Sequence, residues 1–175
     1  KGNILGGMGQ MVGHRMLNMK YIIFDQMESA LEVPDPAGPA YFVDNVVLAE
    51  SNNDEILKTR DFPDFSTAII HKEFADKVTD IPDTPGQNEV LLLDYTPEQL
   101  TYRVSSENGG LVVFSEVWYP KGWYVTIDGQ ESELIRSNYL FRSLVVPAGE
   151  HEVVMTFSPS GGKGETLANV GAFLM

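Results

Sequence analysis

The feature that most constrains this chain is a series of short, strand-like runs in its second half. Asn108-Gly109-Gly110, Asp128-Gly129 and Ala148-Gly149 are turn signals, and such signals separate the runs about every ten residues. Seven runs of this kind predict an antiparallel β-sandwich or jelly roll. The expected strands are residues 89–95, 100–105, 111–118, 123–127, 133–137, 140–146 and 152–157.

Alternation within these runs indicates which side chains enter the core. Trp123 is in phase with Val125 and Ile127, so it is expected to pack in or at the rim of the sandwich rather than form an open stacking platform. Asp128-Gly129 then supplies the positive φ angles of a tight turn. Other expected core positions are Leu100, Tyr102 and Val104 near the start of the series, and Val153, Met155 and Phe157 near its end.

The first half of the chain is less regular. Loosely helical methionine spacing predicts a short helix within residues 8–19, and Ser51, as a capping residue with an acid three residues later, predicts a helix over 54–60. Apolar runs predict strands over 21–24, 41–49 and 67–71. The fold expected is therefore mainly β, with a few short helices in the N-terminal part. Proline and glycine near residue 86 divide an α+β portion, 1–86, from the sandwich core, 87–160, and a tail, 161–175.

Composition and charge exclude several functions. The formal net charge is −13 and no basic cluster occurs, which argues against a nucleic-acid partner. The absence of cysteine excludes disulfides, thiolate metal sites and cysteine nucleophiles.

Catalytic and metal-binding motifs are also missing. His14, His71 and His151 are far apart and lack a ligand spacing, so no metal site is predicted. The glycine-rich runs 6–9 and 160–164 fail the dinucleotide and phosphate-loop patterns. We therefore assign no catalytic residue and expect no cofactor.

From Leu111 to Pro159 several short motifs follow one another: FSE at 114–116, YPKGW at 119–123, IDG at 127–129, RSN at 136–138 and VPAGEH at 146–151. In this combination the sequence resembles the C-terminal soluble region of the YfhO-like bacterial membrane proteins. Residues 17–23 are similar to the segment that opens this region, so the resemblance covers most of the chain.

The resemblance implies a polytopic membrane protein that is similar in plan to the lipid-linked-sugar glycosyltransferases of the GT-C kind. In such enzymes the catalytic acidic residue lies in an early extracytoplasmic loop between membrane helices. That loop is absent from this chain. By this analogy the chain is an extracytoplasmic sandwich domain, with the membrane-embedded remainder of the same polypeptide as its partner. The apolar residues 167–175 become the expected start of a further membrane helix. The chain itself is not expected to carry out glycosyl transfer.

Two hypotheses follow. In the first, the domain positions a glycan, a lipid-linked sugar or a cell-envelope polymer near the membrane, because aromatic rings and hydrogen-bonding side chains together suit sugars. In the second, the same aromatics fill the core and the arginines pair with acids, which makes the domain a structural or protein-interaction module. The candidate glycan contacts are Trp118, Tyr119, Lys121, Trp123, Arg136, Asn138 and Arg142.

Overall fold

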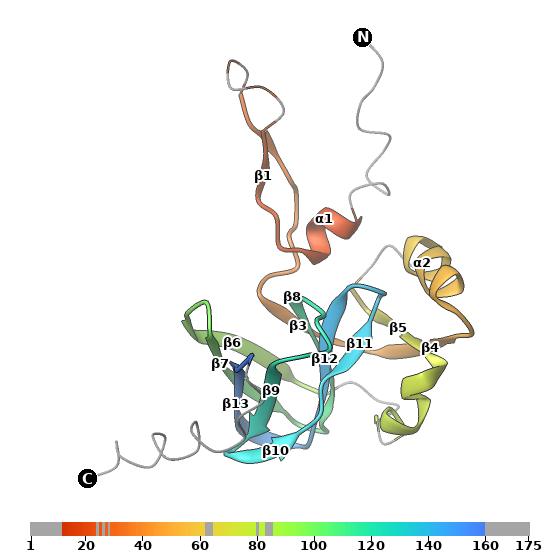
Figure 1. Cartoon of the computed structure of the whole chain (residues 1–175), viewed down its shortest axis with the longest axis vertical. Helices are drawn as coiled ribbons and strands as arrows, with labels where there is room; N and C mark the ends of the chain where they lie inside the picture. Colours follow the sequence, from red (N-terminus) through yellow and green to blue (C-terminus); the bar gives the residue numbers. More distant parts are fainter. Residues whose placement is uncertain are drawn as a thin grey trace.

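The computed structural model of the chain describes residues 12–23, 25, 27, 29–61, 65–79, 81–82 and 86–159. Within them, two β-sheets pack face to face, and a short hairpin projects away from both (Figure 1). The three helices among these described residues are short, and all lie before residue 78. The predicted fold class, mainly β with a few short N-terminal helices, is confirmed. The expectation for the tail 161–175 falls outside the described residues.

One sheet has five strands, all paired antiparallel, in the order β10-β9-β13-β7-β6. Its β9–β10 hairpin turns at Asp128-Gly129, where both residues have positive φ as expected, +51° and +78°. The strands are β6 (Asn88–Tyr95), β7 (Gln99–Ser106), β9 (Trp123–Ile127), β10 (Gln130–Ser132) and β13 (Gly149–Phe157).

The other sheet has six strands in the order β3-β8-β12-β11-β5-β4, and it combines strands from both sides of the boundary expected at residue 86. β4 and β5 are parallel, because the crossover between them contains helix α2 (Asn52–Asp61). The strands are β3 (Ala40–Val43), β4 (Asn45–Ala49), β5 (Thr67–His71), β8 (Gly110–Val117), β11 (Ile135–Ser137) and β12 (Phe141–Val146).

For two of the predicted strands, 41–49 and 133–137, the predicted bounds are wrong. The run 41–49 is broken at Asp44 into β3 and β4, which lie at opposite edges of the six-stranded sheet, so the chain passes from one edge to the other at this residue. The run 133–137 shortens to β11, because Glu133 and Leu134 carry the chain from one sheet to the other. Periodicity could not reveal either break, since both depend on which neighbour each half pairs with.

The main core lies between the two sheets. Tyr102 of β7 meets Phe114 of β8 edge to face, with ring centroids 4.9 Å apart. β8 is buried on both faces over residues 110–114, because a second core covers its other side. The main core contains Leu100, Tyr102, Val104, Val112, Phe114, Val125, Leu144, Val146, Val153 and Met155.

The N-terminal elements cover this second core. Met16 of helix α1 (Val12–Met16) is buried there, and Phe74 of the 3-10 helix η2 (Lys72–Lys77) packs against it. The hairpin of β1 (Tyr21–Ile22) and β2 (Leu31–Glu32) extends beyond α1 (Figure 1).

Candidate functional site

The candidate residues from the sequence fall into two groups at different places. Arg142 and Trp123 lie together at the end of the sandwich where β8 and β13 finish and β9 and β12 begin. We call this the Arg142 end. Arg136 and Asn138 lie on and just after β11, beside α2. The structure therefore does not bring the candidates into one site.

At the Arg142 end, a buried guanidinium covers an aromatic ring. Arg142 is 4% exposed, and its Cζ atom lies 3.8 Å from the ring centroid of Trp123. Trp123 is half-buried and also packs against Phe157, with ring centroids 5.3 Å apart. Gly122, at φ +80°, leads the chain into β9, and a Cβ atom there would lie 2.7 Å from the Phe157 ring. Trp123 is therefore held on two sides by its neighbours.

The hydrogen bonds of Arg142 are incomplete. Its Nε atom donates to the carbonyl oxygen of Val117 at 3.0 Å, whereas its buried Nη1 atom has no partner. Desolvation lowers the pKa of Arg142, against the opposing effect of the nearby Glu116 carboxylate. Desolvation likewise raises the pKa of Glu116, and Arg142 offsets this only in part.

Glu116 owes its position to a β-bulge. Arg142 pairs with Phe114 and Phe141 pairs with Val117, so Ser115 and Glu116 of β8 have no partner on β12. Such bulges change the direction in which side chains point. Glu116 has no role predicted from the sequence, where it is an acidic residue inside a mainly apolar run.

The other aromatic candidates differ in exposure. Trp118 is half-buried and meets Phe74 edge to face, with ring centroids 5.9 Å apart. Tyr119 is 54% exposed, and Lys121 is exposed. Neither tryptophan is thus an open ring, and Tyr119 is the freest aromatic among the candidates.

We expect Tyr119→Ala to change the free energy of unfolding by no more than about 0.5 kcal/mol, because surface substitutions away from packed features have small effects. Urea denaturation of the parent and the variant would measure the difference. A loss above about 1 kcal/mol would show that the ring is packed in solution.

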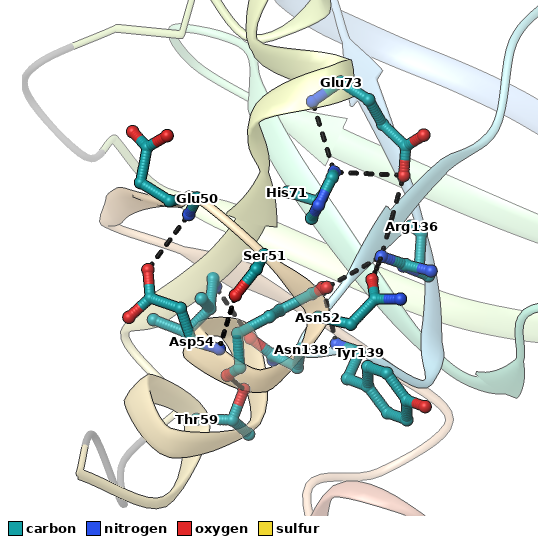
Figure 2. A network of polar contacts seen from close by, with 12 residues as sticks. Glu50, Ser51, Asn52, Asp54, Thr59, His71, Glu73, Arg136, Asn138 and Tyr139 are labelled. Atoms are coloured by element: carbon teal, nitrogen blue, oxygen red, sulfur yellow. Dashed lines mark hydrogen bonds and ion pairs between the residues drawn. The ribbon is translucent and has the colours of Figure 1, made fainter.

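Arg136 and Asn138 belong to a network that joins α2 to the sheet (Figure 2). The Glu55 side chain is fully buried, and its Oε2 atom accepts from Arg136 Nη2 at 2.8 Å. Glu55 Oε1 accepts from the backbone N–H of Tyr139 at 2.7 Å, and Asn52 Oδ1 accepts from the same Arg136 nitrogen at 2.8 Å. Burial raises the pKa of Glu55, and the bonds from Tyr139 and Arg136 oppose that rise.

Asn138 completes the same region from the turn after β11. Its backbone N–H donates to the Ile69 carbonyl at 2.8 Å, and its Oδ1 atom accepts from the Ile69 N–H at 2.7 Å. Asn138 is 3% exposed and has φ +49°, a conformation that asparagine tolerates better than most residues. In the folded chain, Arg136 and Asn138 therefore make internal contacts.

The start of α2 is capped as the sequence predicted, although the helix runs from Asn52 to Asp61 rather than over 54–60. Ser51 Oγ accepts from the Asp54 N–H at 3.2 Å, and Asp54 Oδ2 accepts from the Glu50 N–H at 2.9 Å (Figure 2). The Lys58 ammonium reaches both Asp54 Oδ2 and the Leu48 carbonyl, each at 2.8 Å. These contacts place Glu55 over the sheet.

His71 and His151 make local contacts, whereas the buried Nδ1 atom of His14 has no hydrogen-bond partner among the described residues. His71 Nδ1 accepts from the Glu73 N–H at the start of η2. His151 Nδ1 lies 2.6 Å from Asp128 Oδ2 and His151 Nε2 lies 3.2 Å from the Ala148 carbonyl, so the protonated ring can donate to both. In the part of the chain that the structure describes, no three histidine or acidic side chains cluster as metal ligands.

We expect the His151–Asp128 pair to make stability depend on pH. The hydrogen bond with Asp128 raises the pKa of His151 in the folded state. The stabilisation from protonated His151 is therefore complete below its ordinary pKa of 6.5, and it is lost as pH rises through the higher folded-state pKa. Hydrogen bonds from His151 and from the Glu152 N–H lower the pKa of Asp128 in the folded state. The stabilisation from ionised Asp128 is therefore complete above its ordinary pKa of 3.8, and it is lost as pH falls through the lower folded-state pKa. Asp128→Asn should keep the turn but remove this dependence. Thermal melts at several pH values would show an unchanged profile if the pair is irrelevant.

The described residues form a β-sandwich module in which Arg136, Asn138 and Arg142 make internal contacts. None of the helices in the described residues has the length and apolar character of a membrane span. The family model for the bacterial membrane protein YfhO matches residues 64–167. The chain belongs to this family of membrane proteins, which confirms the resemblance. Searches of curated proteins and of solved structures gave no match.

Proposed function

We propose that this chain is a non-catalytic, extracytoplasmic module of a polytopic membrane protein related to the lipid-linked-sugar glycosyltransferases. Its partner is the membrane-embedded remainder of the same polypeptide. The observation that carries the structural role is the internal use of two glycan candidates: Arg136 bonds to Glu55 of α2, and Asn138 bonds to Ile69 of β5. Family membership supports the attachment to a membrane protein.

The topology can be tested with cysteine labelling, because the chain has no cysteine of its own. Lys121→Cys in the full-length protein places a thiol at an exposed position. We expect a membrane-impermeant maleimide to label it in intact cells, and permeabilisation to add little. The control is the full-length protein without Lys121→Cys, in which any cysteine outside this chain has been replaced by serine. Labelling only after permeabilisation would place the module on the cytoplasmic side.

The second candidate function is positioning of a glycan acceptor. It is favoured by Tyr119 and Lys121, which are exposed on the segment that joins β8 to β9. Aromatic rings with adjacent hydrogen-bonding groups suit saccharides. Loss of acceptor binding in the Tyr119→Ala variant, with an unchanged melting temperature, would support this role.

A further inference from the structure

We propose that the Arg142 end of the sandwich faces the lipid bilayer, and that the tip of the β1–β2 hairpin enters the headgroup region. The inference rests on the proposed attachment of this chain to a membrane-embedded remainder. It adds which end of the module contacts lipid, and it does not depend on which side of the membrane the module occupies.

The hairpin is anchored at the Arg142 end. The Met19 N–H, just before β1, donates to the His14 carbonyl of α1 at 3.0 Å. Met16 of α1 lies beside Asn138, with 4.0 Å between Sδ and Nδ2, and Asn138 belongs to the turn that leads into β12. From this anchor the hairpin projects away from both sheets (Figure 1). It is therefore the part of this end that extends furthest from the sandwich.

Apolar side chains occupy both faces of the hairpin. Tyr21 and Ile22 are neighbours in β1, so their side chains point to opposite faces, and Ile22 pairs with Leu31 of β2. Tyr21 is 61% exposed, Ile23 is 69% exposed, and Met27 near the tip is 92% exposed. A lone two-stranded hairpin is at best marginally stable in water. A partner that covers these side chains would therefore stabilise the hairpin.

The exposed tyrosines of the described residues all lie at this end. Tyr119 follows the end of β8, and Tyr139 lies in the turn before β12. Tyr95 is the last residue of β6, which runs in the same direction as β13 and so finishes at the same end. Tyr21 is on the hairpin. Tyrosine is enriched at membrane–water interfaces, because its ring is apolar and its hydroxyl is polar.

The opposite end of the sandwich has a different surface. The exposed acids Glu107, Asp128 and Glu150 lie at or beside its turns. Among the described residues, no exposed large apolar side chain lies there, since those outside the Arg142 end lie along β4, α2 or β6: Leu48, Ile56, Leu57, Leu91 and Leu93. Anionic lipids repel carboxylates. This distribution favours the orientation in which the Arg142 end faces the membrane.

Charged residues limit how deeply this end can enter. Asp25 lies near the hairpin tip, where its Oδ1 atom accepts from the Met27 N–H at 2.9 Å. A carboxylate is costly in the hydrocarbon core, so the tip is expected to stop among the headgroups. The exposed ammonium groups of Lys20 and Lys121 can pair with lipid phosphates there while staying within reach of water. Other exposed acids of this end lie on the five-stranded sheet, away from the strands that anchor the hairpin: Asp94 and Glu98.

Lipid is the partner that this surface fits. Its exposed apolar residues come from separate segments, namely the hairpin, the ends of β6 and β8, and the connections before β9 and β12. Headgroups and acyl chains adapt to separate projections of this kind, whereas a protein partner needs a matching shape. Membership of a family of membrane proteins also keeps a bilayer close to the chain.

The test places a probe on the hairpin of the full-length protein, in which any cysteine outside this chain has been replaced by serine. Met27→Cys is labelled with the environment-sensitive fluorophore NBD and reconstituted into vesicles of phosphatidylethanolamine and phosphatidylglycerol. We expect blue-shifted emission, and a loss of intensity when the vesicles contain nitroxide-labelled lipids. Water-like emission would overturn the proposal. Blue-shifted emission that nitroxide lipids leave unchanged would also overturn it, because a protein surface would then cover the hairpin.

Gln130→Cys is the matched control, because Gln130 is exposed at the opposite end, just after the β9–β10 turn. Its probe should show water-like emission and no quenching. Tyr119→Cys tests the end itself, and a nitroxide on the lipid headgroup should quench its probe more than the probe at Gln130. Equal quenching at Gln130 and Met27, or none at Tyr119, would refute the orientation. Failure of these measurements would leave the maleimide labelling result, and the side that it assigns, unaffected.

Discussion

Replacing Glu55 by alanine is expected to lower the free energy of unfolding by about 3–5 kcal/mol, because the change removes the buried carboxylate that lies 2.8 Å from Arg136 and leaves Glu73, at 3.6 Å, as the remaining carboxylate beside it. Glu55 is fully buried, and the Arg136 side chain is 15% exposed. The substitution also leaves the Tyr139 N–H without its acceptor. Urea denaturation at neutral pH would measure the loss.

Two comparisons make this result interpretable. Glu133→Ala removes the acid of an exposed pair with Lys77, and should cost no more than about 1 kcal/mol. The double variant Glu55→Met with Arg136→Met replaces the buried pair by apolar side chains, and should be more stable than Glu55→Ala alone. If Glu55→Ala were as harmless as Glu133→Ala, the network in Figure 2 would not hold α2 on the sheet.

Trp123→Ala is expected to cost about 3 kcal/mol, near the lower end of the range for large aromatic truncations, since the ring is half-buried. The variant loses the contacts with the main core and with Phe157, and it uncovers the buried guanidinium of Arg142. Thermal and urea denaturation would measure the effect.

Trp123→Phe is the matched control, because phenylalanine keeps an aromatic face for Arg142 and should recover part of the loss. A Trp123→Ala protein as stable as the parent, but without saccharide binding, would make Trp123 a ligand contact rather than a packing residue. The expectation of packing rests on its phase with Val125 and Ile127 and on its position between Arg142 and Phe157.

Several local features could be read from the sequence. Ser51 and Asp54 predicted the start of α2, and Asp128-Gly129 predicted a tight hairpin with positive φ angles. These succeed because caps and turns depend on residues within a few positions of one another. The alternation of apolar residues also assigned Tyr102 and Met155 correctly to the core, because every second side chain of a strand points to the same face of the sheet.

The candidate site was harder to predict, because its geometry joins distant residues. Arg136 was proposed as a glycan contact. Its hydrogen-bonded partner, Glu55, lies 81 positions earlier in the sequence, on helix α2, whose residues are mostly polar. Glu116 received no role, because the bulge that removes it from the ladder arises only when β8 pairs with β12. No local pattern contains such information.

The sequence by itself thus determined the mainly β class, the turn positions and the inward faces of most strands, since each follows from the chemistry of neighbouring residues. Only the tertiary structure decided that the run 41–49 divides at Asp44 between two sheet edges, and that Glu55 is buried. The physical reason is that strand partners and side-chain burial are set by long-range packing, in which the same local pattern has different energies beside different neighbours.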